Sequence, residues 1–320
     1  MIRAFVYGMR LMNYRLLFAV SLLAASASAF AEEVASEAKA DARPVYRSAQ
    51  QIIDAATEAD WRTPSAQNLL YMQLPTGLVV IELAPDFAPL HVANVRTLAK
   101  EGFWDNTSIY RSQDNFVVQF GDADGEDPAK AKSLGSARTH LPAEFTRKLE
   151  GMNFTRLPDV DGWAKQVGFV DGFPVGVDPV KGEAWLAHCY GTVGAGRNEA
   201  DDSSIGAELY VAIGQSPRQL DHQLSTIGVV RKGMELLSTI KRGPPPMGMI
   251  EKPEDRTPIL SVKLGSEVPE SQRVNLQVMK TESATFAAMV EARRNRVDGF
   301  YKVPAGHIDL CNIPVPVREK

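Results

Sequence analysis

The sequence predicts a mainly β protein built as an antiparallel barrel or sandwich. Short apolar runs recur along the chain and are separated by turns rich in glycine and proline. Only two helical patterns interrupt these runs in the central part of the chain, and strands do not alternate with helices. Because neighbouring parallel strands need a helix-length crossover between them, this order argues against a doubly wound α/β fold.

The predicted elements follow one another in a simple order. Residues 68–74 and 78–83 read as two strands joined by a tight Pro-Thr-Gly turn. A helix is predicted over residues 88–102, because apolar residues recur there at helical spacing, proline stands in the first turn and Gly102 ends the pattern. Further strands are predicted at 116–120, 209–213, 226–230 and 259–264, with a second short helix at 233–240.

The composition is that of an ordinary globular protein of 320 residues, with 44% hydrophobic and 23% charged residues. The formal charge of −4 provides no large positive field for a nucleic-acid backbone, so no nucleic-acid partner is predicted. The two cysteines, Cys189 and Cys311, are too few for a disulfide scaffold or a structural zinc site. They could form one bridge, and the sequence leaves that pairing open.

The N-terminus has the pattern of an export signal. Three arginines precede the apolar run 16–25, and small residues lead to Ala-Phe-Ala at 29–31. This order is typical of a secretory signal peptide over residues 1–31, whereas a transmembrane anchor would need about 20 apolar residues. We therefore expect cleavage after Ala31 and a periplasmic or secreted protein with no membrane span.

The rest of the chain divides by composition. Residues 32–65, rich in alanine and charge, are expected to form an N-terminal tether or arm. Residues 66–265 hold the apolar density of the main domain, with an insertion at about 123–188 that is too long for an ordinary connection. The tail, residues 266–320, is expected to pack on the barrel as a helix and an extended segment. One face of that helix is marked by Phe286, Met289, Val290 and Val297.

The most informative segment runs from 109 to 122 and reads Ile-Tyr-Arg-Ser-Gln-Asp-Asn-Phe-Val-Val-Gln-Phe-Gly-Asp. It resembles the cyclophilin family of peptidyl-prolyl isomerases, whose pattern is Phe-His-Arg, four residues, then Phe-Met-x-Gln-Gly-Gly-Asp. The match has no gap and includes Arg111, Phe116, Gln119, Gly121 and Asp122. The resemblance covers residues 68–122 and 189–265 and leaves out the insertion and the tail.

This resemblance implies a closed eight-stranded antiparallel barrel capped by two helices, with an outer groove that binds proline-containing unfolded or extended polypeptides. The implied function is a peptidyl-prolyl cis-trans isomerase that assists the folding of exported proteins without a cofactor or metal. Arg111 is the implied catalytic residue, because a guanidinium that donates to the prolyl nitrogen favours the twisted amide. The implied substrate-binding residues are Tyr110, Phe116, Val117, Gln119, Ala195, Arg197, Glu208, Leu209, Tyr210 and Leu224.

Several positions depart from the family pattern. Tyr110 stands in place of the usual histidine, and Val117 in place of a methionine. The usual Ser-Gln-Phe-Phe is Ala-Glu-Leu-Tyr at 207–210, so either Leu209 or Tyr210 replaces the pocket phenylalanine. Gln219 and Leu224 align with a tryptophan and a histidine. These changes favour an alternative hypothesis, a catalytically weak or inactive peptide-binding or chaperone module. The client proteins and the oligomeric state remain open.

Two other features are weaker as sites. The acidic stretch 122–127 resembles the opening of a calcium loop, but Ser133 stands where the closing glutamate is required, which favours a solvated acidic turn. The five histidines show no metal-binding spacing. The sequence therefore predicts no metal site.

Overall fold

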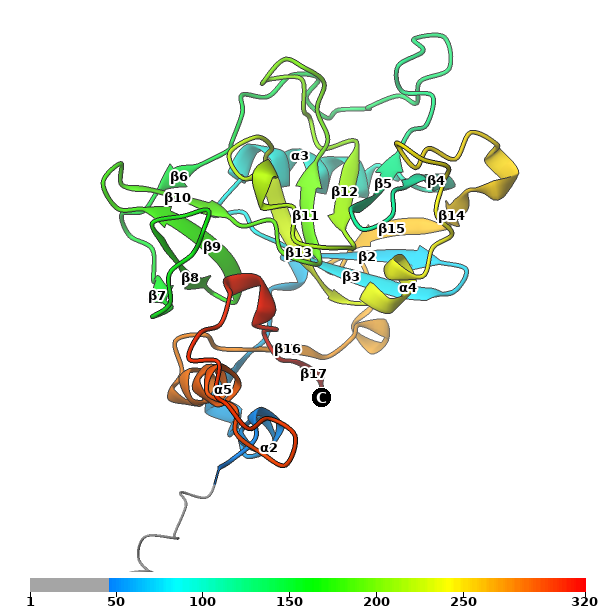
Figure 1. Ribbon diagram of the computed structural model, residues 1–320. Helices are drawn as coiled ribbons and strands as arrows, with labels where there is room; N and C mark the ends of the chain where they lie inside the picture. The colour runs from blue at the N-terminus through cyan, green and yellow to red at the C-terminus, as the bar shows by residue number, and fades with distance from the viewer. Residues whose placement is uncertain (1–45) are drawn as a thin grey trace, which may run out of the picture. The chain divides into compact units, whose positions relative to one another are not determined.

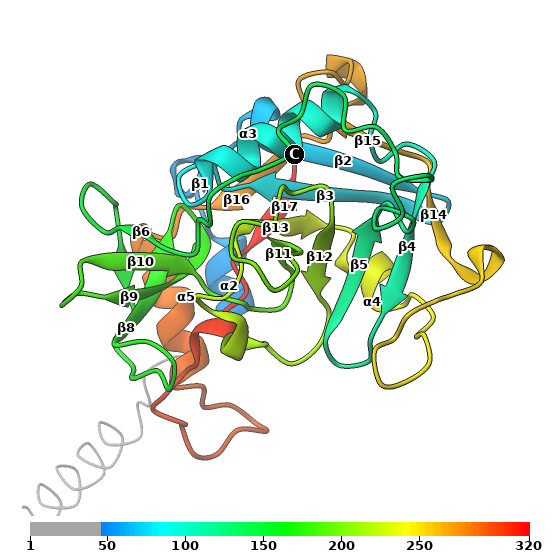
Figure 2. The ribbon, with the colours of Figure 1, turned by 90° about the horizontal axis from the view of Figure 1, so that it is seen from above.

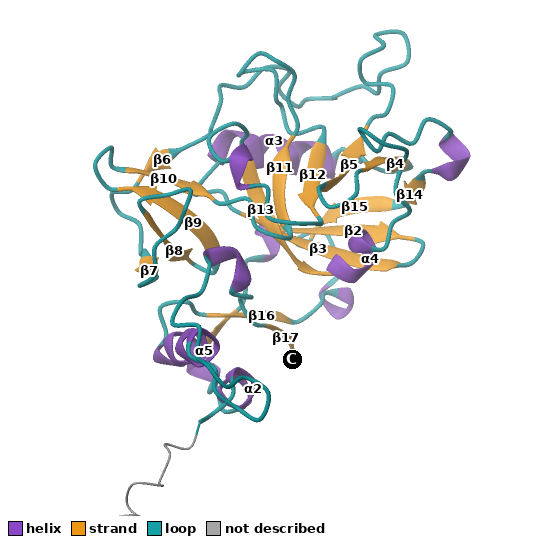
Figure 3. Ribbon diagram, viewed as in Figure 1, coloured by secondary structure: helices purple, strands orange, loops and turns teal. Residues whose placement is uncertain are grey.

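The computed structural model describes residues 46–320, and their strands form three antiparallel sheets. The predicted signal peptide and the first part of the predicted arm lie outside the described residues. Figure 1 follows the chain in colour, and Figure 3 shows that strands are the main regular structure. No helix within residues 46–320 is both long and apolar enough to cross a membrane.

The largest sheet in this part of the chain has nine strands and curves into a barrel (Figure 2), so the predicted mainly β barrel is confirmed. Each strand pairs antiparallel with its neighbours. In hydrogen-bonded order the strands are β14 (Thr257–Ile259), β4 (Thr107–Ser112), β5 (Val117–Gly121), β12 (Leu209–Ala212), β11 (Thr192–Ala195), β13 (Thr226–Lys232), β3 (Gly77–Leu83), β2 (Leu69–Leu74) and β15 (Ser261–Leu264).

The barrel has one strand more than the predicted eight because a single segment is split in two. β14 and β15 lie at the two edges of the sheet, yet only Leu260 separates them in sequence. The Leu260 N–H donates to the carbonyl of Gln73 on β2 at 2.9 Å. The segment 257–264 therefore pairs first with β4 and then with β2, and it closes the barrel by bending from one edge to the other.

Alternation along the strands fills the barrel. In β2 the side chains of Leu70, Met72 and Leu74 are fully buried in the main core, as period-two spacing requires. Helix α3 (Pro89–Lys100) begins with proline in its first turn and packs Val95 and Leu98 into the same core. It lies next to β15, while the short helix α4 (Met234–Ser238) contacts β3. Both helices fall within the predicted ranges.

The segment predicted as an insertion contains a sheet of its own, which Figure 1 shows in green beside the barrel. Its strands, in order, are β6 (Arg147–Lys148), β10 (Glu183–Leu186), β9 (Phe173–Asp178), β8 (Gln166–Val170) and β7 (Thr155–Arg156). The β8–β9 turn is Asp171-Gly172, with φ of +49° and +81°. Apolar side chains of this sheet pack against Ala84 and Phe87 and against Val229 of β13, which fixes the insertion to the barrel.

A third sheet joins the two ends of the described chain. It consists of β1 (Trp61–Arg62), β16 (Leu276–Met279) and β17 (Val317–Glu319), with β16 in the middle. Helix α2 (Ala49–Asp54) contacts α5 (Ala284–Arg294), as Figure 1 shows. The prediction that Val297 lies on the tail helix is wrong, because α5 ends at Arg294 and the Val297 side chain is exposed. Short 3-10 turns cover Glu58–Asp60, Ala66–Asn68, Arg218–Leu220, Pro253–Asp255, Glu270–Gln272 and Leu310–Asn312.

A disulfide bond ties the tail to the barrel. Cys189, three residues before β11, is bonded to Cys311 in the tail, with the two Cα atoms 5.0 Å apart. The bond spans 122 residues of sequence. The pairing that the sequence left open is therefore present in this structure.

Candidate active site

One row of residues crosses four neighbouring strands on the outer face of the barrel. Arg111 on β4 lies opposite Gln119 on β5, Gln119 lies opposite Tyr210 on β12, and Tyr210 lies opposite Gly194 on β11. Residues directly opposite each other in an antiparallel sheet point to the same face. The register alone therefore brings Arg111, Gln119 and Tyr210 together.

A β-bulge places a further side chain on this face. The β4–β5 register shifts between Ile109 and Arg111, so that Tyr110 and Arg111 together face Gln119. The side-chain amide of Gln119 serves both: it accepts from Arg111 Nη1 at 3.1 Å and donates to the Tyr110 hydroxyl at 2.8 Å. Gln119 therefore holds the side chains of both Tyr110 and Arg111 in place.

The guanidinium of Arg111 is held by three hydrogen bonds within the described residues. Besides Gln119, it donates from Nη2 to Gln113 Oε1 at 2.5 Å and from Nε to the Met247 carbonyl at 2.8 Å. Arginine has five N–H donors in a planar fork, so two remain for a bound peptide. Partial burial lowers the pKa of Arg111, but arginine starts so high that the group stays charged at neutral pH.

Phe116 lies beside this guanidinium, with the Arg111 Cζ atom 5.9 Å from its ring centroid. It occupies the turn between β4 and β5 and is half-buried, which leaves part of its ring accessible to a ligand. Val117 follows at the start of β5, on the same face as Gln119, and is almost fully buried. The Phe116 ring therefore gives the site an apolar part next to the charged one, with Val117 packed behind the face.

Glu208 connects the site to the acidic turn that follows β5. Its carboxylate accepts from the Tyr110 hydroxyl at 2.5 Å and from the Asp122 backbone N–H at 2.7 Å. Burial raises the pKa of Glu208 to about 7, and the nearby carboxylates of Asp122 and Glu126 add to that shift. Burial and the same Glu208 charge raise the pKa of Tyr110, so its hydroxyl remains protonated.

The structure resolves which residue of β12 faces the site. Leu209 is fully buried in the barrel core, so it is not on the groove side, whereas Tyr210 lies on the face of Gln119. The Tyr210 ring lies across β11, where a Cβ at Gly194 would overlap its hydroxyl. That hydroxyl is 2.8 Å from His188 Nε2. Tyr210 is itself buried, with 5% of the residue exposed, so its ring packs over the β11 backbone beneath the face of Gln119.

Three other residues suggested by the resemblance have different surroundings. Ala195 is fully buried in the barrel core, because it pairs with Leu209 and shares its inward face. Arg197, just after β11, links two loops, because it donates to the carbonyl of the neighbouring Asn198 and to that of Gln223, both at 2.7 Å. Leu224 follows Gln223 and is half-buried.

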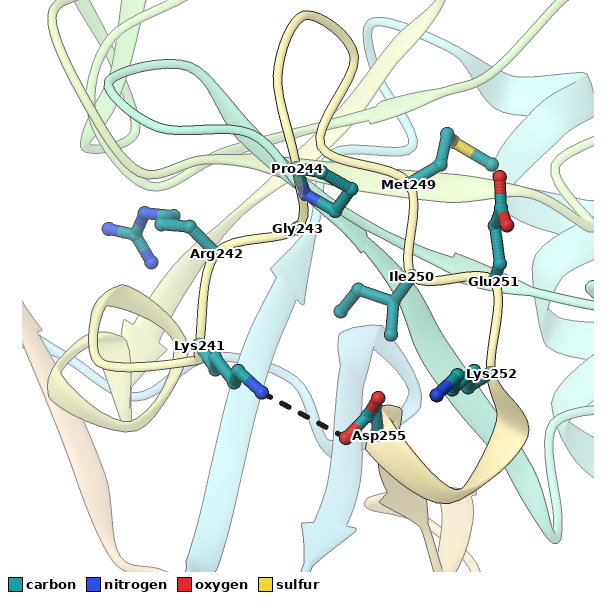
Figure 4. A pocket seen from close by; sticks show the side chains of 9 residues that line it. All are labelled: Lys241, Arg242, Gly243, Pro244, Met249, Ile250, Glu251, Lys252 and Asp255. Carbon is teal, nitrogen blue, oxygen red and sulfur yellow. Dashed lines mark ion pairs between the residues drawn. The ribbon is translucent and has the colours of Figure 1, made fainter.

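A pocket of about 220 Å³ lies beside Arg111. Met249, on its wall, forms an isolated backbone bridge with Arg111. Figure 4 shows the side chains that line it, with the Lys241–Asp255 ion pair at 3.9 Å across its lower part. The exposed side chain of Met249 and the ring of Pro244 are apolar groups among the lining residues of this pocket.

Sequence reasoning missed three residues of the site. Gln113 lies only two residues after Arg111 but has no place in the family pattern. Met247 contributes a backbone carbonyl, which side-chain patterns cannot reveal. His188 follows the apolar strand β10 and has no spacing signal. In the sequence it was considered only as one of five histidines without metal-binding spacing.

The family model for "Cyclophilin type peptidyl-prolyl cis-trans isomerase/CLD" matches residues 69–264, which is more than half of the chain. A "Probable peptidyl-prolyl cis-trans isomerase" of Brucella suis is 27% identical over 183 residues, covering 55% of this chain and 73% of the relative. A "Peptidyl-prolyl cis-trans isomerase-like 1" of Gibberella zeae is 25% identical over 195 residues, covering 61% of this chain and 90% of that protein.

Among solved structures, the cyclophilin AquaCyp293 from Hirschia baltica has a similar fold. The TM-score is 0.64 at 23% sequence identity, covering 86% of this chain and 98% of that one. This coverage exceeds the segment matched by the family model, so the structural similarity extends beyond the barrel strands.

Proposed function

The chain belongs to the cyclophilin-type peptidyl-prolyl cis-trans isomerase family, and on that premise we propose that it catalyses rotation about X-Pro bonds with Arg111 as the stabilising group. The observation that carries the proposal is the row of Arg111, Gln119 and Tyr210 on one face of the barrel, with Phe116 beside the guanidinium. It combines a fixed cation with apolar surface, as a twisted prolyl amide requires.

Rotation about an X-Pro bond is slow because amide resonance resists it. In the twisted transition state the prolyl nitrogen loses that resonance and becomes a better hydrogen-bond acceptor. A guanidinium aimed at this nitrogen binds the transition state more tightly than either planar isomer, which lowers the barrier. The three internal bonds of Arg111 hold the group in place before substrate arrives, so little orientation entropy is lost on binding.

The same proposal assigns the substrates. The site lies on the outer face of the barrel, and Arg111 forms a backbone bridge with Met249, which lines the neighbouring pocket. An extended polypeptide can place its proline near Phe116 and continue past Arg111. We therefore propose unfolded or extended segments of exported proteins as the substrates.

Export is supported by the N-terminal pattern and by the disulfide between Cys189 and Cys311, because such bonds persist in oxidising compartments. Expression of the full chain in a bacterial host tests this part. A periplasmic product whose N-terminus is Glu32 is expected; a cytoplasmic product that retains Met1 would refute export without touching the enzymatic proposal.

Exchange NMR on a short X-Pro peptide tests the activity directly. We expect the chain from Glu32 onward to accelerate exchange between the cis and trans resonances, and Arg111→Ala to remove most of that acceleration. The matched control is Arg293→Ala, an exposed arginine on α5, which should leave exchange unchanged. Equal exchange rates with and without the wild-type chain would refute the proposal.

A second candidate is a peptide-binding module with weak or no catalysis. The observation that favours it is that three of the five Arg111 donors are already bonded within the described chain. A titration run beside the exchange experiment separates the two: binding of the X-Pro peptide without accelerated exchange supports the module, and binding with exchange supports the enzyme.

A further inference from the structure

A chain of buried polar groups leads from Tyr210, which lies opposite Gln119 on the barrel, into the insertion. It begins at Tyr210, passes through His188 and Asp221, and ends at Arg218 and Asp161. The side chains of His188, Asp221, Arg218 and Asp161 are between 1% and 6% exposed. Buried polar groups are costly unless they are bonded to one another, so an arrangement of this length needs a structural or functional reason.

The geometry fixes the orientation of the His188 ring. Burial alone would raise the pKa of Asp221, but the hydrogen bond from His188 and the charge of Arg218 bring it below the ordinary value. The carboxylate is therefore ionised and can only accept. It accepts from the His188 backbone N–H at 3.0 Å and lies 2.9 Å from His188 Nδ1, so Nδ1 carries a proton.

With Nδ1 donating to Asp221, the other ring nitrogen, Nε2, faces the Tyr210 hydroxyl at 2.8 Å. The two ring planes are within 6° of parallel, which suits a directed bond in the plane of both rings. Burial raises the pKa of Tyr210, so its hydroxyl keeps the proton it donates. The bond thus holds the tyrosine ring flat over Gly194.

The other end of the chain reaches the insertion. Arg218 donates from Nε to Asp221 at 2.7 Å, and its two terminal nitrogens contact both oxygens of Asp161 at 3.0 and 3.1 Å. Trp185, on β10 of the insertion sheet, adds a bond from Nε1 to Asp221 at 3.1 Å. Two residues of the insertion, Trp185 directly and Asp161 through Arg218, therefore hold the Asp221 carboxylate. That carboxylate in turn orients His188.

We propose that the insertion positions the proline-binding surface through this buried chain, with Asp161, Arg218, Asp221 and His188 as positioning residues that fix the ring of Tyr210. The inference rests on the proposed function, since it assigns Tyr210 to the floor of the substrate groove. Without its hydrogen bond to His188, the Tyr210 ring would rotate away from Gly194 and change the surface that contacts the prolyl ring. Because this surface contacts planar and twisted amide alike, loss of the anchor weakens substrate binding more than the chemical step.

Three variants test the proposal by exchange NMR and by peptide titration. Tyr210→Phe keeps the ring and removes the hydroxyl that bonds to His188. Asp161→Asn weakens the ion pair with Arg218. Each is expected to raise the KM and the Kd of an X-Pro peptide about three- to tenfold, which is the change expected when one hydrogen bond is lost. The kcat should stay within about twofold of the wild-type value. The double variant should be no weaker than Tyr210→Phe alone, since Asp161 acts through that hydroxyl.

The control is Asp178→Asn, an insertion aspartate that pairs with Lys165, which should leave the KM and Kd unchanged. Independently of substrate, the His188 Nε2 resonance in a histidine ¹⁵N spectrum should shift in Tyr210→Phe while Nδ1 stays protonated. Unchanged Kd in Tyr210→Phe, or additive effects in the double variant, would overturn the proposal. If the wild-type chain binds peptide without exchange, the enzymatic claim fails while the Kd and ¹⁵N measurements still decide this one.

Discussion

Gln119 lies directly opposite Arg111 on the neighbouring strand and accepts from its guanidinium at 3.1 Å. The same side chain donates to the Tyr110 hydroxyl, because the bulge at Tyr110 places two residues against one. Gln119 therefore performs two tasks at once, accepting through its amide oxygen and donating through its amide nitrogen.

Replacing Gln119 by alanine should lower kcat/KM for an X-Pro peptide about tenfold, since Arg111 and Tyr110 both lose a partner. Gln73→Ala is a suitable control, because Gln73 lies on β2 and donates only to the adjacent Leu74 carbonyl among the bonds described here. Exchange NMR measures both variants. Equal losses in the two would mean that Gln119 has no special role in the site.

Glu208→Gln should change how stability depends on pH. With a folded-state pKa of about 7 and an ordinary value near 4.5, the folded chain holds a proton that the unfolded chain loses between these pH values. Stability conferred at this site is therefore complete at acid pH and declines as pH rises toward 7. The glutamine variant removes that decline and should be more stable than wild type at pH 8, by about 1 to 3 kcal/mol.

Urea unfolding at pH 4.5 and pH 8 provides this measurement. The exposed Glu270 serves as a control, and Glu270→Gln should follow the wild-type curve. A Glu208→Gln protein with the same pH dependence as wild type would contradict the raised pKa.

Glu82→Gln should be strongly destabilising. The carboxylate of Glu82 lies between Arg62 at 2.6 Å and Arg231 at 2.7 Å, and the side chains of Glu82 and Arg231 are 5% and 3% exposed. Removing its charge leaves two guanidinium groups without compensation, a loss on the order of 3 to 5 kcal/mol. By contrast, Glu58→Gln, which breaks exposed ion pairs with Arg318 and Lys320, should cost far less. Similar losses in the two variants by urea unfolding would show that burial is not the deciding factor.

Replacing both Cys189 and Cys311 by serine should lower the free energy of unfolding by roughly 2 to 5 kcal/mol, because the bond closes a long loop in the unfolded chain. The wild-type chain should gain no mass on alkylation until it is reduced. Addition of two alkyl groups without reductant would refute the bond in solution.

The sequence was sufficient for the barrel and for part of the site, for reasons that differ by element. The β2–β3 hairpin and α3 carry strong local signals, namely period-two and helical spacing bounded by Gly and Pro, and the structure has both. The β8–β9 hairpin was missed although Asp171-Gly172 is a strong turn signal, because the surrounding glycines, prolines and charges favoured an irregular loop.

In the site, a linear pattern gave Arg111, Phe116 and Gln119, but it could not show that a bulge turns Tyr110 onto the same face. The choice between Leu209 and Tyr210 also depended on register, which is a property of strand pairing. The sequence could not identify the role of His188, since that role comes from contacts with Tyr210 and Asp221, which are 22 and 33 positions away.

The bond between Cys189 and Cys311 makes a covalent ring of the chain that contains the six strands from β11 to β16. The exposed loop that carries Met247 and Met249 lies inside this ring. A protease that cleaves one peptide bond in that loop would leave a product heavier by one water molecule and still in one piece. The two fragments would separate only after reduction and unfolding, so a nicked protein would pass unnoticed on a non-reducing gel.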